Sequence, residues 1–138
     1  MKKALSVSVF LCIALVLVAC GRKEPPQLTA ETPPPEIASL KHEIVTNNLA
    51  FDIRLEGGSE GVGYQIDRAE IDPHCNCPGF WRRYFEQPPS LKVAGENMRK
   101  LVSLRGGRVE YAFRLRAVDG LGRLSAWSKT IRAKSAPQ

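Results

Sequence analysis

Residues 109–119 read Val-Glu-Tyr-Ala-Phe-Arg-Leu-Arg-Ala-Val-Asp, and this stretch decides the fold. Its apolar residues occupy every second position, and they are Val109, Tyr111, Phe113, Leu115 and Ala117. Residues two apart on a strand share one face of the sheet. The alternation therefore predicts a strand with one buried face, from which Arg114 and Arg116 point outward.

The same period of two recurs on both sides of this stretch. In residues 49–55 the apolar positions alternate, and Gly57-Gly58 ends the run. Tyr64, Ile66 and Arg68 share a face in the next run, and Trp127, Ile131 and Ala133 share a parity after a turn at residues 119–122. Residues 91–104 fit either a short helix or a loop followed by a strand at about 99–104. About seven short strands with turns between them predict an all-β antiparallel sandwich.

Residues 104–119, followed by Gly122, Ser125 and Ser128, resemble the second half of a fibronectin type III domain, and residues 63–68 resemble its third strand. The resemblance covers about residues 35–134 and implies an immunoglobulin-like β-sandwich. It also implies that Tyr111 forms a tyrosine corner, in which the hydroxyl bonds backbone a few residues upstream. The tryptophan expected at the end of the second strand is replaced here by Leu55.

The amino terminus has the features of an export signal. Met1-Lys2-Lys3 precedes an apolar run at about residues 4–18, which is shorter than the ~20 residues of a spanning helix. The run ends in Leu17-Val18-Ala19-Cys20, which resembles the lipobox of bacterial lipoproteins. This resemblance implies cleavage before Cys20 and attachment of lipid to its thiol and its new amine, so that the protein is held on a membrane by several acyl chains.

Three segments follow from these patterns. Residues 1–19 are the predicted lipoprotein signal peptide, 20–35 the lipidated terminus and a linker that holds half of the prolines, and 36–135 the fibronectin type III-like domain. The combination resembles small bacterial lipoproteins that carry such a domain. Gly21 in place of Asp favours, by resemblance to lipoprotein sorting, the outer membrane with the domain facing the periplasm.

Composition restricts the partners. The formal charge of +6 falls to +4 once Lys2 and Lys3 leave with the signal peptide, and the remaining Lys and Arg form no dense cluster. Export and this weak basic excess argue against nucleic acid and are compatible with anionic lipid or glycan.

Cys75 and Cys77 are the cysteines that remain in the predicted domain, in the motif His74-Cys75-Asn76-Cys77 between two prolines. An oxidising compartment favours a local disulfide between them. A zinc site is the alternative, but the four ligands that zinc requires are not supplied by the sequence around them. The spacing also differs from the Cys-x-x-Cys of redox proteins. We expect no metal and no cofactor.

Residues 79–85, Gly-Phe-Trp-Arg-Arg-Tyr-Phe, combine aromatic side chains with two arginines, which is typical of binding surfaces. Alternation places Phe80, Arg82 and Tyr84 on one face and Trp81, Arg83 and Phe85 on the other, with one set expected in the core. Arg114 and Arg116 are expected to pair across strands with Asp67. The candidate interaction surface consists of Trp81, Arg82, Arg83, Tyr84, Arg114 and Arg116.

No paired carboxylates, Ser-His-Asp set or glycine-rich phosphate loop is recognisable, so we expect no enzyme. The leading hypothesis is a lipid-anchored cell-envelope protein that presents its β-sandwich to another envelope protein. A carbohydrate- or peptidoglycan-contacting accessory module is the alternative. An envelope assembly factor is a third, because residues 20–25 resemble the start of small lipoproteins that help lipopolysaccharide transport assemble.

Overall fold

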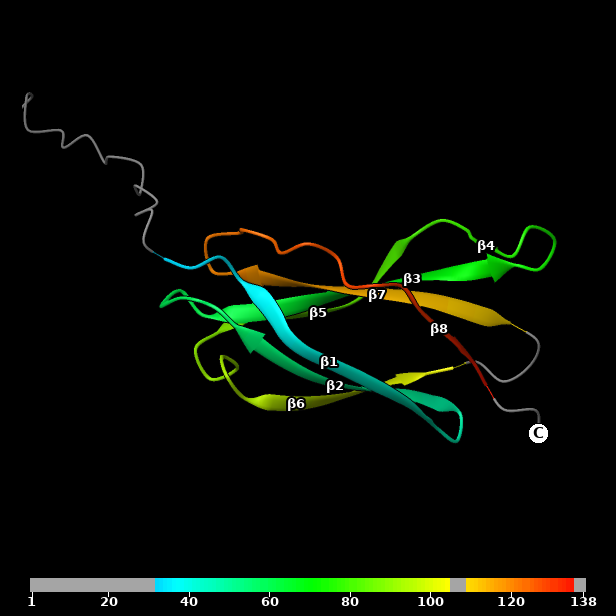
Figure 1. Cartoon of the computed structure of the whole chain (residues 1–138), viewed down its shortest axis with the longest axis horizontal. Helices are drawn as coiled ribbons and strands as arrows, with labels where there is room; N and C mark the ends of the chain where they lie inside the picture. The colour runs from blue at the N-terminus through cyan, green and yellow to red at the C-terminus, as the bar shows by residue number, and fades with distance from the viewer. Residues whose placement is uncertain (1–31, 105–108, 136–138) are drawn as a thin grey trace, which may run out of the picture.

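The computed structural model describes residues 32–104 and 109–135, and in these residues it is an all-β sandwich without a helix (Figure 1). The strands are β1 (Glu36–Val45), β2 (Asn48–Glu56), β3 (Val62–Asp72), β4 (Cys77–Pro78), β5 (Arg82–Ser90), β6 (Asn97–Ser103), β7 (Glu110–Asp119) and β8 (Ile131–Lys134). The predicted fold class is confirmed.

Two antiparallel sheets form the sandwich. One has the order β1-β2-β6, and the other has the order β4-β3-β7-β8 with β5 also paired to β3. Strand β3 lies inside the second sheet, with β7 along one edge and both β5 and β4 along the other. The longest pairing in this sheet joins β3 to β7, from Val62 opposite Asp119 to Glu70 opposite Tyr111.

The core lies between the sheets and is built by the predicted alternations. Leu49, Phe51, Ile53 and Leu55 of β2 are buried, and so are Tyr111, Phe113, Leu115 and Ala117 of β7. The rings of Phe51 and Phe113 meet edge to face across the sandwich at 5.9 Å between centroids. Burying one such side chain contributes roughly 1.5–3 kcal/mol. Val109 departs from the pattern, because it precedes β7 and is 39% exposed.

The second alternative for residues 91–104 is confirmed, since β6 runs from Asn97 to Ser103 and no helix forms there. Gly95 explains the loop before it. Its φ of +77° lies in the left-handed region, and its N–H donates to the carbonyl oxygen of Leu55 at 2.8 Å. Strand β1, which pairs with β2 along its length, has a bulge between Ile37 and Ser39 that interrupts its alternation and made it hard to predict.

The start of the domain is held by a buried ion pair. Asp119 is 2% exposed and accepts hydrogen bonds from the Leu121 N–H at 3.0 Å, the Arg123 N–H at 2.8 Å and Arg123 Nε at 2.6 Å. Arg123 in turn donates to the carbonyl oxygens of Thr32 at 3.0 Å and Pro33 at 3.3 Å. We call this contact the tether root. The predicted signal peptide, the predicted lipidation site Cys20 and residues 20–31 of the predicted linker lie outside the described residues.

Burial by itself raises the pKa of Asp119, but the hydrogen bonds and positive charge of Arg123 and the Leu121 N–H outweigh it and hold that pKa below its ordinary value. Because the pKa is lower in the folded state, the resulting stabilisation is complete above the unfolded value of about 3.9 and is lost as the pH falls through the folded value.

Asp119→Asn removes this charge and keeps the shape of the side chain. We expect the free energy of unfolding at neutral pH to fall by about 1–3 kcal/mol. Since the wild-type carboxylate also becomes neutral in acid, the difference between the two proteins should shrink at about pH 3. Urea unfolding followed by circular dichroism measures both values, and a difference that stays constant with pH would contradict this role.

Candidate functional site

The outward face of the five-stranded sheet carries a charged network centred on Asp67. Asp67 lies opposite Arg114 in the β3–β7 register, and Gln65 lies opposite Arg116. Asp67 is only 7% exposed, and its carboxylate accepts hydrogen bonds from Arg83 Nε at 2.7 Å and from Arg114 Nη2 at 3.3 Å. Arg116 Nε donates to Gln65 Oε1 at 2.8 Å. The predicted cross-strand ion pair of Arg114 with Asp67 is confirmed, whereas Arg116 bonds an amide.

Above this network two tryptophans and two arginines alternate, and we call Trp81, Arg114, Trp127 and Arg116 the Trp–Arg stack. The guanidinium carbon of Arg114 lies 4.3 Å from the ring centroid of Trp81 and 4.2 Å from that of Trp127, and the guanidinium carbon of Arg116 lies 4.3 Å from Trp127. Arg114 Nε is buried and has no hydrogen-bond partner among the described residues. The cationic groups are therefore held by stacking as well as by hydrogen bonds.

Two serines place Trp127 over this face. Ser125 and β7 residue Ala117 exchange bonds, with the Ser125 N–H donating to the Ala117 carbonyl at 3.0 Å and the Ala117 N–H donating to Ser125 Oγ at 2.8 Å. Ser128 and Leu115 repeat this arrangement: the Ser128 N–H donates to the Leu115 carbonyl at 2.7 Å, and the Leu115 N–H donates to Ser128 Oγ at 3.0 Å. Each serine hydroxyl accepts the hydrogen bond that a backbone carbonyl of a neighbouring strand would accept in a regular sheet.

The shared parity of Trp127 with Ile131 and Ala133 therefore does not bring it into the core. Strand β8 begins only at Ile131, and Ile131 and Ala133 are buried while Trp127 stacks on the outer face. The period of two therefore holds only from Ile131 onward and does not extend through the serine-held segment.

A β-bulge divides the predicted aromatic faces of β5. In the register with β3, Ile66 lies opposite Phe85 and Asp67 lies opposite Arg83, so Tyr84 is the extra residue. Phe85 packs against the core, with its ring 5.7 Å from that of Tyr64, while Trp81 and Arg83 stay outside. The prediction that Trp81, Arg83 and Phe85 share a face is wrong for Phe85, because the bulge adds one residue to the alternation.

The predicted interaction surface is divided between the two faces by the alternation itself. Trp81, Arg83, Arg114 and Arg116 gather on the outer face, while Arg82 and Tyr84, together with the border residue Arg83, line a hollow of about 640 Å³ between the end of β3 and residues 79–84. We call this hollow the notch. Phe80 lines the notch and is 89% exposed. The neighbouring Gly79 N–H donates to the Glu70 carbonyl at 2.8 Å.

Arg68 also lines the notch and was not among the predicted site residues. Its guanidinium carbon lies 4.7 Å from the ring centroid of Tyr84 and 4.8 Å from that of Tyr111. The signal that could have identified it is its parity, because Arg68 shares the inward face with Tyr64 and Ile66. The backbone that Tyr111 would bond in a tyrosine corner includes residues 105–108, which are not described, so that expectation stays a prediction.

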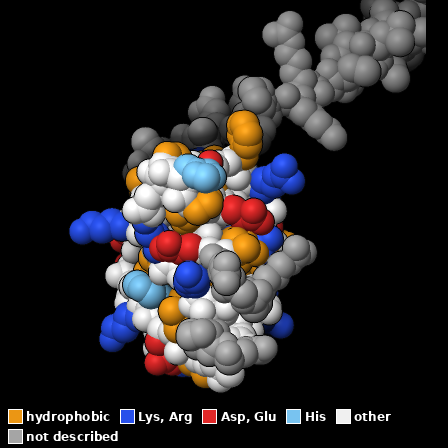
Figure 2. Space-filling view, turned by 90° about the vertical axis from the view of Figure 1, so that its right-hand side faces the viewer, with side chains coloured by type: hydrophobic (Ala, Val, Ile, Leu, Met, Phe, Trp, Pro, Cys, Tyr) orange, Lys and Arg blue, Asp and Glu red, His pale blue; other side chains and the backbone are white. Residues whose placement is uncertain are grey.

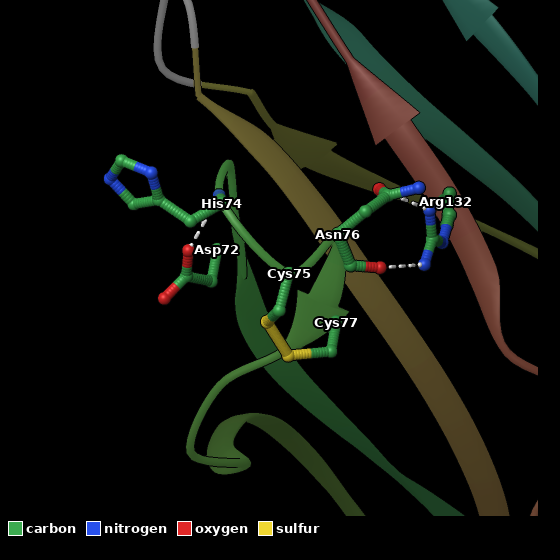
Figure 3. Close-up of a disulfide and its surroundings, with 6 residues drawn as sticks. All are labelled: Asp72, His74, Cys75, Asn76, Cys77 and Arg132. Carbon is green, nitrogen blue, oxygen red and sulfur yellow. Dashed lines mark hydrogen bonds between the residues drawn. A yellow bond between two sulfur atoms is a disulfide. The ribbon is translucent and has the colours of Figure 1, made fainter.

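Beyond the notch, β3 and β4 form a hairpin whose turn carries the disulfide (Figure 3). Cys75 and Cys77 are joined as expected, with their Cα atoms 5.2 Å apart rather than the ~6.6 Å of an extended strand. Asn76, at a φ of +54°, makes the turn. Arg132 of β8 donates to Asn76 Oδ1 at 2.9 Å and to its carbonyl oxygen at 2.8 Å, and the His74 ring points away from the sulfurs.

A second hollow, of about 780 Å³, lies between β1 and residues 124–131 beside the tether root. Its walls include Ile37, Leu40 and Leu124, so it is a mainly apolar opening between the exposed edges of the two sheets. None of the predicted site residues lines it.

Within residues 32–104 and 109–135, no group of three or more His, Cys, Asp or Glu side chains is arranged to hold a metal ion. The described part of the chain contains no helix long and apolar enough to cross a membrane. No protein-family model, curated protein or solved structure matches the chain.

Trp127→Leu tests the Trp–Arg stack. It removes two cation–π contacts of about 0.5–1 kcal/mol each, so we expect the free energy of unfolding to fall by about 1–2 kcal/mol. Trp81→Leu removes one such contact and should cost about half as much. Urea unfolding followed by far-ultraviolet circular dichroism gives both values, and equal losses, or none, would show that the alternating arrangement does not stabilise the fold.

Proposed function

We propose that the chain is a small bacterial lipoprotein with a fibronectin type III-like domain, which acts without catalysis by docking on another protein of the cell envelope. The observation that supports docking is the exposure of Phe80. A large aromatic side chain that is 89% exposed beside a concave, arginine-lined notch is the composition of an anchor for a protein interface.

The anchor rests on the sequence of residues 17–20 and on the compartment that it implies. Cleavage before Cys20 leaves twelve residues before Thr32, which is the first residue held at the tether root. At ~3.1 Å per residue in extended polyproline form, this linker spans up to ~37 Å. The domain is thereby positioned off the membrane surface, facing the periplasm if the lipid sits in the outer membrane.

The start of β1 and the hairpin of β3 and β4 lie at opposite ends of the sandwich (Figure 1). The tether root lies at the first of these ends and the notch at the second. Arg123 holds Thr32 next to the end of β7 that pairs with Val62, while the notch lies where β3 reaches Glu70 and Ile71. Figure 2 looks at the end away from the tether root, where apolar side chains reach the surface among basic and acidic ones. A partner at this end meets no hindrance from the membrane that holds the tether.

A protein partner fits this surface better than a glycan. Sugar rings stack on exposed indoles, but Trp81 and Trp127 are engaged by arginines in the Trp–Arg stack. Phe80 remains the most exposed aromatic side chain at the notch, where it suits an apolar partner side chain. The peptidoglycan- or carbohydrate-contacting module and the envelope assembly factor are the alternative functions.

Phe80→Ala tests the docking, and Leu91→Ala is its control, because Leu91 is 67% exposed and follows β5 at the tether-root end. Full-length tagged chains are purified from cross-linked membranes, and binding to isolated cell wall is measured in parallel. We expect Phe80→Ala to lose its protein partner and Leu91→Ala to keep it. A partner retained by both variants, or binding to cell wall alone, would refute a protein-docking role for the notch.

Cys20→Ser tests the anchor. We expect it to abolish lipid labelling and to leave an uncleaved or mislocalised precursor, because the thiol that carries the lipid is gone. Metabolic labelling with a fatty acid and membrane fractionation measure these two effects. Lipid labelling and membrane association that match the wild type would refute the anchor.

A further inference from the structure

The notch places two like charges opposite each other without a direct ion pair to either of them among the described residues. Arg68 and Arg82 lie directly opposite each other in the antiparallel pairing of β3 with β5. Like charges at directly opposite positions destabilise a sheet. No hydrogen bond or ion pair joins either guanidinium to a carboxylate in the described part of the chain, whereas Arg83, beside them, is already bonded to Asp67 and Glu86.

Two tyrosine rings position the guanidinium group of Arg68. The rings of Tyr84 and Tyr111 stack on its guanidinium group, at 4.7 and 4.8 Å from the guanidinium carbon. Stacking occupies the flat faces of a guanidinium group, and its N–H donors project from the edge. Arg68 is only partly exposed and lines the notch together with Arg82. Two guanidinium groups on one wall of a hollow are suited to bind an anion between them.

The unpaired edge of β5 indicates that the ligand is an extended chain. Among the described strands β5 pairs only with β3, so its other edge has no backbone partner. Pro88 and Pro89 lack N–H groups, and they hinder pairing along the carboxyl-terminal half of this edge. The half that remains open, residues 82–85, is the half beside the notch. An extended chain that pairs there lies beside Arg82.

We propose that the notch binds the carboxylate of an Asp or Glu side chain in an extended segment of the partner protein, an inference that rests on the docking function proposed above. Glu70 and Asp72 also line the notch, so the anion that enters carries a single charge more readily than the −1.5 to −2 of a phosphate group. Phe80 and Tyr84 supply an apolar wall for the residues next to that carboxylate.

The test uses the full processed chain in detergent and measures the Nε–Hε signals of its arginines by nuclear magnetic resonance. The probes are a capped pentapeptide with one glutamate between valines, the same peptide with glutamine, and inorganic phosphate. We expect the glutamate peptide to shift the Arg68 and Arg82 signals saturably, and the glutamine peptide to leave them unchanged.

Arg82→Gln should weaken the binding of the glutamate peptide at least about tenfold, which corresponds to 1.4 kcal/mol. Because it also removes the like-charge neighbour of Arg68, its thermal midpoint without ligand should equal or exceed that of the wild type. Arg54→Gln is the matched control, since Arg54 is exposed on β2 in the other sheet, and it should bind as the wild type does. Equal binding of the two peptides, tighter binding of phosphate, or full binding by Arg82→Gln would overturn the carboxylate site.

The same variants separate this inference from the docking function. If membrane capture of the partner is lost in Phe80→Ala and retained in Arg82→Gln, the docking function stands and the carboxylate site is refuted. If both variants lose the partner and Arg54→Gln keeps it, the two proposals are supported together. Capture that is unaffected in both refutes both.

Discussion

The antiparallel pairing of β3 with β7 is the constraint on which the rest of the structure depends. It joins nine residue pairs from Val62–Asp119 to Glu70–Tyr111, and both strands lie inside the five-stranded sheet. Because side chains alternate across a sheet, this one register sends Ile66 and Leu115 into the core and Asp67 and Arg114 to the outer face. A shift by one residue would exchange the two sets and bury the charges.

The same ladder connects the features that the proposed function uses. At one end, Asp119 holds Arg123 and through it the tether root. At the other end, Arg68 lines the notch and lies against the ring of Tyr111, next to the hairpin whose turn carries the disulfide. Between them, Arg114 and Arg116 carry the Trp–Arg stack. The tether root and the proposed docking surface are thus separated by a pair of strands rather than by loops.

Local alternation was sufficient to predict the core of this fold but not all of its surface. The runs at residues 49–55 and 111–117 are read correctly because each follows one regular strand with one buried face. Phe85 was misplaced because a bulge at Tyr84 depends on how β5 meets β3, which the sequence of β5 does not reveal. Alternation does not determine the position of Trp127, because serine hydroxyls replace backbone pairing in its segment. The notch depends on Arg68 and Arg82, 14 positions apart in the sequence, lying opposite each other.

The measurement that tests this account most directly is native-state amide hydrogen exchange on the full chain. If β3 and β7 form the rigid centre, the amides that bond between residues 62–70 and 111–119 open only with global unfolding and exchange last. The amides of β1 and β5, at the edges of the two sheets, exchange earlier through local opening. Slowest exchange in β1 and β2, with β3 and β7 opening at the rate of the edge strands, would contradict the central role of this pairing.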